Sequence, residues 1–308
     1  SDFEDLLKAP SEPPASTLTR ASSMAEVNPD HSGTPAFSWK YVDWTPFTAI
    51  ALLHLACLAA PFYFSWSALG IAILLWWIAG GLGICLCYHR LLTHRSFKTP
   101  KPVEYALTAM GCLNLQGGPI KWVGTHRIHH KESDTDLDPH SPKHGFDWAH
   151  VLWCVVNDPY GRDLRQYAPD LRRDRVMVWL DKYFWVPQVA VAVALYAIGG
   201  LPWLIWGVAV RTVFTYHATW FVNSASHTWG YRNFDTREES RNLWWVSLLS
   251  FGEGWHNNHH AFPRSAAHGL RRLEFDPTYW TIKAMSWVGL ARDIHVPRVA
   301  LEEARGRT

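Results

Sequence analysis

Two long runs without charged residues restrict the fold of this chain more than any other feature of its sequence. Residues 44–88 contain no Asp, Glu, Lys or Arg, and residues 183–210 contain none either. A helix of about 20 apolar residues crosses the ~30 Å hydrocarbon core of a bilayer. The first run is therefore long enough for two spans joined at residues 61–65. The second run contains a turn signal, Gly-Gly-Leu-Pro at residues 199–202, and predicts a second hairpin.

This pattern predicts an all-α membrane protein with four transmembrane helices, arranged as two hairpins. The fourth helix, residues 203–226, has about 24 residues and a length of about 36 Å. Because this length exceeds the thickness of the hydrocarbon core, the helix is expected to project beyond the membrane and carry His227 with it. Arg211 lies inside this helix, and we expect it to bond to neighbouring carbonyl groups rather than to a substrate.

Basic residues predict the orientation of the chain. Residues 89–182 are rich in Lys and Arg, whereas the loop at residues 61–65 has none. Cytoplasmic segments of membrane proteins carry the excess of positive charge. We therefore expect residues 89–182 to belong to a cytoplasmic helical cap, with both chain termini on the same side.

The chain divides into three predicted parts: a disordered cytoplasmic tail (1–40), a four-span domain with its cap (41–297) and a C-terminal tail (298–308). The first part is rich in Pro, Ser and Thr and has no hydrophobic periodicity. The 19 Trp residues suit a protein in contact with the bilayer. The formal net charge of +2 gives no reason to expect a nucleic acid partner.

Three shorter segments receive individual predictions. Residues 103–115 and 243–251 are apolar but too short to span, so each is expected to form a helix on the membrane surface. Residues 231–242 are predicted to form a charged connector on the protein surface.

The motif His-x-x-His-His occurs twice, at residues 126–130 and 256–260. With 17 His in the chain, a single copy is expected by chance about 0.05 times. On a helix, offsets of three and four residues place all three imidazoles on one face, within reach of a common centre. The two copies therefore predict metal binding.

Two further segments supply histidines at the predicted cytoplasmic level. His89 and His94 are five residues apart, about 140° on an ideal α-helix, so the helix is expected to end or bend between them. Asn223 and His227 are four residues apart and share a face of the fourth helix. The nine histidines of these segments and the two motifs exceed the needs of one ion, since a zinc or non-haem iron site takes three or four protein nitrogens. Two metal ions are therefore predicted, and ligand type alone leaves iron and zinc both open.

Carboxylates near these histidines have a predicted supporting role. One or two of Asp134, Asp136 and Asp138, together with Glu253, are expected to accept N–H bonds from ligand histidines. The remaining eight histidines of the chain lack paired spacing and are not predicted to bind metal.

These motifs resemble the three histidine boxes of the membrane fatty-acyl desaturase family, HxxxxH, HxxHH and HxxHH, with a further histidine after the fourth span. Residues 116–124 and 252–255 look most like bacterial and cyanobacterial Δ9 desaturases. The resemblance implies a mushroom-shaped four-span protein, with two Fe ions in a cytoplasmic cap and a kinked tunnel for one acyl chain. It also implies the bacterial inner membrane. The ligands would be His89, His94, His126, His129, His130, His227, His256, His259 and His260, with Asn223 reaching one metal through water.

The resemblance also suggests residues that contact the substrate. Trp153 and Trp220 match tryptophans that would line the tunnel or brace the site, and Gln116 and Trp122 lie in the segment expected to select the acyl carrier. Trp77, which lies deep in the second span, is a candidate for the closed end of the tunnel.

One departure from the animal acyl-CoA members bears on the substrate. Where those members have an Arg-Lys pair this chain has Asn157 and Asp158, and Gly124 replaces an Arg before the second box. A polyphosphate head group would lose charge-assisted bonds there, which favours an acyl-lipid over acyl-CoA.

The implied activity is O₂-dependent Δ9 desaturation of a long-chain acyl group. The chain has no haem or Cys₄ cluster motif, so an external donor is expected, either a ferredoxin or a cytochrome b5-like protein with its reductase. A purified sample could contain zinc. The alternatives are a membrane fatty-acyl hydroxylase on the same scaffold and a non-catalytic membrane protein that binds metal or lipid.

Overall fold

The computed structural model describes residues 39–158, 160–297 and 302. In this part of the chain every regular element is a helix, and the remaining backbone pairing consists of isolated β-bridges. The prediction of an all-α protein is confirmed. The tails predicted at residues 1–40 and 298–308 lie almost entirely outside the described residues.

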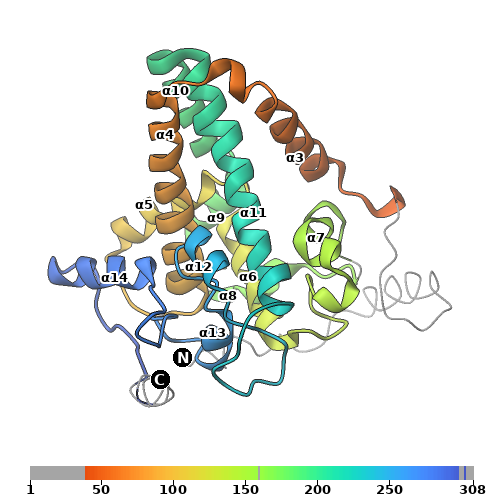
Figure 1. Cartoon of the computed structure of the whole chain (residues 1–308), viewed down its shortest axis with the longest axis vertical. Coiled ribbons are helices and arrows are strands. Elements are labelled where there is room, and N and C mark those ends of the chain that lie inside the picture. Colours follow the sequence, from red (N-terminus) through yellow and green to blue (C-terminus); the bar gives the residue numbers. More distant parts are fainter. Residues whose placement is uncertain (1–38, 159, 298–301, 303–308) are drawn as a thin grey trace.

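Four helical segments form a tower above a broader helical base, which we call the cap (Figure 1). The first segment is α3 (Trp44–Cys57), and the second is α4 (Trp66–Trp76) with its continuation η3 (Trp77–Thr93). The third and fourth segments are the two arms of one long helical stretch, which consists of α10 (Val186–Leu204), η7 (Ile205–Val210), α11 (Arg211–Ser224) and η8 (Ala225–His227). Two continuous stretches, Trp66–Thr93 and Val186–His227, are long and apolar enough to cross a membrane, whereas α3 is shorter. Gly200, with a φ of 61°, interrupts the second stretch at the predicted turn, so this stretch forms a hairpin.

Side chains fix the ends of these helices. The Asp43 carboxylate caps α3 by accepting a bond from the Thr45 amide (3.2 Å), and Ser65 Oγ caps α4 by accepting from the Ala68 amide (3.1 Å). Such caps satisfy amides that lack a partner within the helix. The short helix η2 (Ala60–Tyr63) joins α3 to α4, and Trp206 Nε1–H donates to Ala60 O (3.1 Å), which links the tips of the two hairpins.

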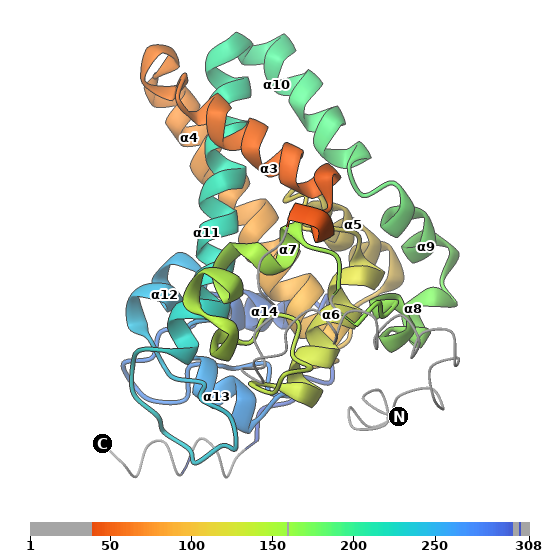
Figure 2. The same ribbon diagram turned by 90° about the vertical axis from the view of Figure 1, so that its right-hand side faces the viewer.

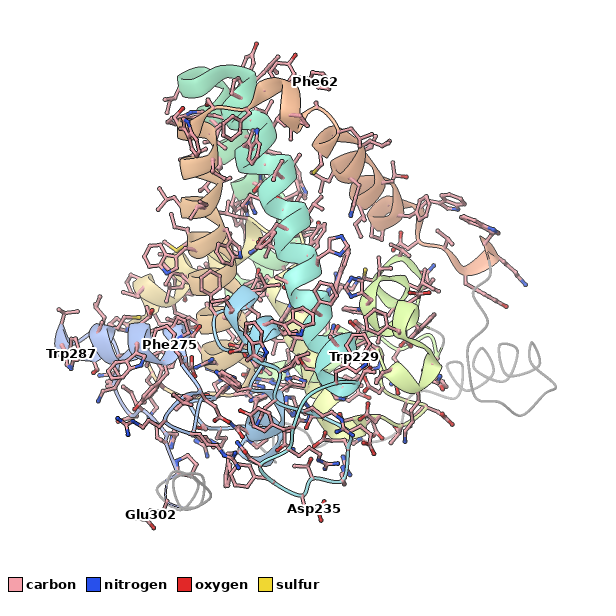
Figure 3. All side chains as sticks on the ribbon, viewed as in Figure 1. Phe62, Trp229, Asp235, Phe275, Trp287 and Glu302 are labelled. Carbon is pink, nitrogen blue, oxygen red and sulfur yellow. The ribbon has the colours of Figure 1, made fainter. Side chains whose placement is uncertain are left out.

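The surface of the tower is apolar. Its exposed residues include Leu52 (60% exposed), Val193 (65%), Ile198 (73%) and Phe62 (85%) at the tip (Figure 3). Large apolar side chains exposed in this number are unfavourable in water and are stable against lipid. Together with the two stretches long and apolar enough to cross a membrane, they indicate a membrane protein.

The cap contains shorter helices, and most polar side chains of the protein lie in the cap (Figure 3). Its helices are η1 (Trp39–Tyr41), α5 (Lys101–Cys112), α6 (Pro119–Glu132), η4 (Pro142–His144), η5 (Trp148–Leu152), α7 (Trp153–Val155), η6 (Leu164–Tyr167), α8 (Pro169–Arg172), α9 (Arg175–Lys182), α12 (Trp244–Leu249), α13 (His256–Ala261) and α14 (Pro277–Trp287). From the side, α3 leans across the tower, and α10 descends toward α9 at the edge of the cap (Figure 2).

The helix η3 runs from the tower into the centre of the cap and packs closely on α5. A Cβ atom added to Gly83 would lie 2.4 Å from the amide nitrogen of Gly111, so the two backbones touch without side chains between them. Leu107 and Cys112 of α5 are buried in the same core. The predicted surface helix at residues 103–115 therefore has its apolar face against η3 rather than against lipid, because the two glycines permit close packing.

Arg211 is fully buried at the start of α11. Its Nη1 donates to Leu113 O (2.7 Å) and its Nη2 to Gln188 Oε1 (2.6 Å). Leu113 follows the C-terminus of α5, where the helix dipole favours a positive charge. The expectation that Arg211 has a structural role, bonded to neighbouring carbonyl groups, agrees with these contacts.

Candidate metal centre

The nine histidines of the three boxes and the fourth helix meet in the cap as two clusters. The first cluster consists of His89, His94, His126, His130 and His259, and the second of His129, His227, His256 and His260. Within each cluster, one ring nitrogen of every histidine lies within 4.8 Å of those of all the others. The rings of His130 and His260 stack across the boundary with centroids 4.5 Å apart, so the clusters are neighbours.

Each His-x-x-His-His box divides its histidines between the two clusters. In α6 the first and last histidines, His126 and His130, have Nε2 atoms 3.1 Å apart and join the first cluster. In α13 the equivalent pair, His256 and His260, has the same Nε2 separation of 3.1 Å but joins the second cluster. The middle histidines, His129 and His259, cross to the opposite cluster. The common centre expected for all three histidines of one box is therefore wrong, because the pair at offset four and the histidine at offset three serve different clusters.

A π-helix brings the two histidines of the first box together. The helix η3 ends at Thr93, between His89 and His94 as expected, but it is wound as a π-helix to that point. The His94 amide donates to His89 O (3.1 Å), an i to i+5 bond, and the two rings lie with centroids 4.8 Å apart. Since a π turn takes more residues than an α turn, residues five apart return to nearly the same face. The estimate of 140° applies to an α-helix and does not hold here.

The end of α11 supplies the fourth segment. His227 is 4% exposed, and its Nε2 lies 3.1 Å from that of His256. Asn223, which is 9% exposed, lies four residues earlier, near the end of α11, while His227 ends η8. The role of Asn223 as a ligand through water stays a prediction.

Carboxylates contact the outer nitrogens of the clustered histidines. Nδ1 of His129 lies 3.0 Å from Asp138, Nδ1 of His227 lies 3.1 Å from Asp134, and Nδ1 of His89 lies 2.6 Å from Glu253. Asp136 is exposed and takes no such part. A carboxylate on Nδ1 fixes the tautomer and the ring orientation and directs the Nε2 lone pair toward a metal.

The electrostatics of the clusters favour neutral imidazoles. Burial, followed by the proximity of the other histidines, holds the pKa well below its ordinary value for six of the nine: His94, His126, His130, His256, His259 and His260. For His129 burial acts in the same direction, but Asp138 outweighs it and raises the pKa. Converging neutral nitrogens with no proton donor between them are the donor set that a divalent metal requires. The residues present therefore fit two imidazole-ligated metal ions.

Two residues that the sequence analysis passed over hold the third box in place. Asn257 Oδ1 accepts bonds from the amides of Asn233 (2.8 Å) and Phe234 (2.9 Å), and Asn258 Nδ2 donates to Glu274 Oε2 (2.7 Å). The predicted surface connector at residues 231–242 is thus partly buried, with Asn233 and Asn242 at 1% exposed or less. The sequence did contain a signal for this role, because both positions that the His-x-x-His-His motif leaves open in the third box are asparagine.

Of the five predicted substrate residues, Trp122 packs directly on a clustered histidine and Gln116 is bonded to Trp122. Gln116 Nε2 donates to Thr219 Oγ1 on α11 (3.1 Å), and Trp122 Nε1–H donates to Gln116 Oε1 (3.2 Å). The Trp122 ring stacks on His126 with centroids 5.3 Å apart. The Trp153 ring packs at a tilt against His140, with centroids 5.0 Å apart, and the Trp220 ring stacks on Tyr216 (5.1 Å).

Trp77 has a different environment. It is 43% exposed on the outside of η3, whereas its neighbour Trp76 packs on Phe251 with ring centroids 4.5 Å apart. This placement does not support Trp77 as the closed end of a tunnel. A tryptophan in a span can face lipid or protein, and sequence alone does not separate the two.

At the three positions that depart from the acyl-CoA pattern, Gly124, Asn157 and Asp158, the residues already pack on or bond to neighbouring residues. A Cβ atom on Gly124 would lie 1.9 Å from Leu164 O, so η6 packs directly on α6 there. Asp158 is paired with Arg162 at 2.7 Å, and Asn157 Nδ2 donates to Tyr41 O (3.2 Å). An arginine side chain cannot occupy position 124 in this fold.

Comparison with known proteins identifies the family of this chain. A family model described as "Fatty acid desaturase" matches residues 64–279. The chain is 48% identical over 278 residues to a protein of Nostoc sp. (strain 36) named sn-2 palmitoyl-lipid 9-desaturase, covering 89% of this chain and 95% of that protein. It is 49% identical over 255 residues to a protein of Anabaena variabilis named sn-1 stearoyl-lipid 9-desaturase, covering 82% and 94%. The chain belongs to the fatty acid desaturase family.

Proposed function

We propose that this protein is an O₂-dependent Δ9 acyl-lipid desaturase that places a cis double bond in a saturated acyl chain. The observation that carries the proposal is the pair of buried clusters, five and four histidines, in a chain about half identical to proteins named acyl-lipid 9-desaturases. The balanced reaction consumes one O₂, two electrons and two protons, removes two hydrogens from adjacent methylenes, and releases two waters.

The first cluster would hold one iron and the second cluster the other, with Asn223 reaching the second through water. When bound, the two irons would supply the activation of O₂ that hydrogen removal from an unactivated methylene requires. Zinc has the same ligand preferences and would give an inactive protein.

The chain's own residues would exclude water and fix the position of the substrate. Eight of the residues around the clusters are at most 5% exposed: His89, His94, His129, His227, His256, His259, Asp138 and Glu253. A series of contacts through Thr219, Gln116 and Trp122 connects α11 to the His126 ring. An acyl chain held beside these residues would keep one pair of its C–H bonds next to the clusters. Electrons would come from a ferredoxin, or from a cytochrome b5-like protein with its reductase.

We also propose that α3, α4 with η3, and the two arms of the second hairpin form four spans, with the cap in the cytoplasm of a bacterium and the tower in its inner membrane. The apolar surface of the tower and the Lys and Arg residues of the cap support this arrangement. Two exposed tryptophans, Trp244 (65% exposed) on α12 and Trp287 (72%) on α14, would lie at the lipid interface, where tryptophan is favoured. Figure 3 shows Trp287 at the outer end of α14.

An acyl-lipid substrate is favoured over acyl-CoA. Leu164 occupies the space beside Gly124, and Arg162 is already paired with Asp158, so neither site offers a free cation to a polyphosphate. The experiment is expression in a host that lacks Δ9 activity, followed by gas chromatography of each lipid class. Double bonds in glycerolipids with an unchanged acyl-CoA pool support the proposal, whereas a hydroxylated product would identify the hydroxylase alternative. Unsaturation that persists in a His129→Ala variant would identify a non-catalytic protein.

A further inference from the structure

The two histidine clusters lie in different electrostatic surroundings. In the second cluster three of the four histidines face a buried carboxylate through Nδ1: His129 faces Asp138 (3.0 Å), His227 faces Asp134 (3.1 Å) and His260 faces Glu238 (3.8 Å). All three carboxylates are at most 5% exposed. Among the described residues, none of the three pairs with a Lys or Arg. The second cluster therefore has three negative charges close to it.

The first cluster has more histidines but less negative charge. Of its five members, His89 faces a carboxylate, that of Glu253 (2.6 Å). The other oxygen of Glu253 accepts two bonds from Arg90, at 3.0 and 3.1 Å, and Arg90 also pairs with Asp276 (2.9 Å). Arg90 is fully buried, and its positive charge offsets one of these two negative charges beside the cluster.

A second buried arginine lies on the same side. Arg127 is fully buried inside the second box and donates to Leu92 O (3.0 Å) and Thr93 O (3.4 Å), directly before His94. Its partner Asp170 (2.7 Å) also pairs with Arg95, so the three arginines of this region (Arg90, Arg95 and Arg127) balance its three carboxylates (Glu253, Asp276 and Asp170). The three carboxylates of the second cluster have no such arginine partners among the described residues.

We propose that the second cluster is the tighter of the two metal positions and binds its ion first. This inference rests on the metal centre proposed above. A carboxylate on Nδ1 makes the imidazole a stronger donor, and the unbalanced negative charge attracts a divalent cation, whereas a fifth neutral imidazole adds a donor without charge. Loss of one such carboxylate typically weakens metal binding about 10-fold to 100-fold.

The test uses the full chain in lipid nanodiscs, stripped of metal and titrated with Co²⁺ alone. Bound metal is counted by elemental analysis, and binding is followed by the visible absorption of the ion. In the wild type we expect two binding events whose affinities differ by at least about tenfold. Asp138→Asn should weaken the tighter event about tenfold and leave the weaker event in place, whereas Glu253→Gln should weaken the weaker event alone.

Two further variants make the test specific. Asp134→Asn acts through His227 and should also weaken the tighter event, which covers the case in which Asp138→Asn does not fold. Asp158→Asn removes a carboxylate paired with Arg162 away from both clusters and should change neither event. Equal affinities in the wild type, or a weaker first event in Glu253→Gln, would overturn the order of loading while leaving the metal centre intact. A wild type that binds no Co²⁺ would overturn both proposals.

Discussion

The second and third histidine boxes have the same spacing but are held in place by different chemistry. In the second box the residue after the first histidine is Arg127, which pairs with Asp170 (2.7 Å) and donates to Leu92 O (3.0 Å). This side chain therefore fastens α6 to the end of η3, where the first box lies. A buried ion pair and charged donors hold the second box.

The third box is held through neutral amide side chains, one of which donates to the Glu274 carboxylate. Asn258 Oδ1 accepts from Asn233 Nδ2 (2.7 Å) and Asn242 Nδ2 (2.9 Å), while its own Nδ2 donates to His268 O (2.8 Å). These bonds are needed because α13 has six residues, against 14 in α6. The comparison shows that histidine spacing specifies the ligands, whereas the intervening residues specify how the box is attached to the rest of the cap.

The largest loss of activity is expected when a metal ligand is removed, because both boxes supply ligand histidines. Replacing one ligand in each, His129→Ala and His259→Ala, removes a nitrogen from the second and the first cluster, and each should lower desaturation at least about 100-fold. The measurement is the ratio of unsaturated to saturated acyl chains in an expressing host. His295→Ala, an exposed histidine outside both clusters, should retain full activity. Activity in either ligand variant would show that one box is dispensable.

The next largest effect concerns stability and distinguishes the second box from the third. Arg127→Met leaves the partly buried Asp170 carboxylate with Arg95 as its remaining partner and leaves three carbonyl groups without their donor. Removing one partner of a buried ion pair costs up to about 3–5 kcal/mol. A clear fall in the unfolding temperature of the detergent-purified protein is therefore expected. Lys98→Met is the matched control, because Lys98 (69% exposed) pairs with Asp293 (54%) at the surface and such pairs contribute less than about 1 kcal/mol. Equal shifts for the two variants would contradict the role given to Arg127.

A smaller loss is expected in the third box. Asn258→Ala removes the bonds of one neutral amide, including the one to the Glu274 carboxylate, and each donor or acceptor left buried and unpaired costs about 1–3 kcal/mol. The unfolding temperature should fall less than in Arg127→Met, and Asn258→Asp should not restore it because the new charge would face Glu274. If Asn258→Ala were the more damaging change, the contrast between a charged and a neutral attachment would be reversed.

The smallest effect is a pH dependence. His268, whose ring packs on His259 of the third box with centroids 4.4 Å apart, has its pKa lowered to about 4, first by burial and then by Arg90. Below the unfolded value of about 6.5 the unfolded chain binds a proton that the folded chain does not, so metal-free stability falls as pH drops from about 6.5 to about 4. The pKa of His150, also about 4 through burial, and the lowered pKa values of the six cluster histidines act in the same direction. Thermal unfolding measured across this range checks the slope, which His268→Asn should reduce.

The sequence identified nine histidines that the structure brings together, because box spacing and helix length are local properties. Their division between clusters could not be predicted, since it depends on the π winding of η3 and on how α6 and α13 face each other. The exposure of Trp77 and the burial of Asn233 and Asn242 likewise follow from packing between distant segments. Uncharged runs predicted the two stretches that are long and apolar enough to cross a membrane, Trp66–Thr93 and Val186–His227, but the glycine contact that buries α5 against η3 required the structure.

The identity of the acyl carrier and the double-bond position test the account most directly. Expression in a host without Δ9 activity, with lipids separated by class and the double bond located by mass spectrometry, measures both together. The account predicts a cis double bond at carbon 9 of acyl chains esterified in glycerolipids, lost in His129→Ala. A bond at another carbon, a hydroxyl group in its place, or products confined to the acyl-CoA pool would contradict it.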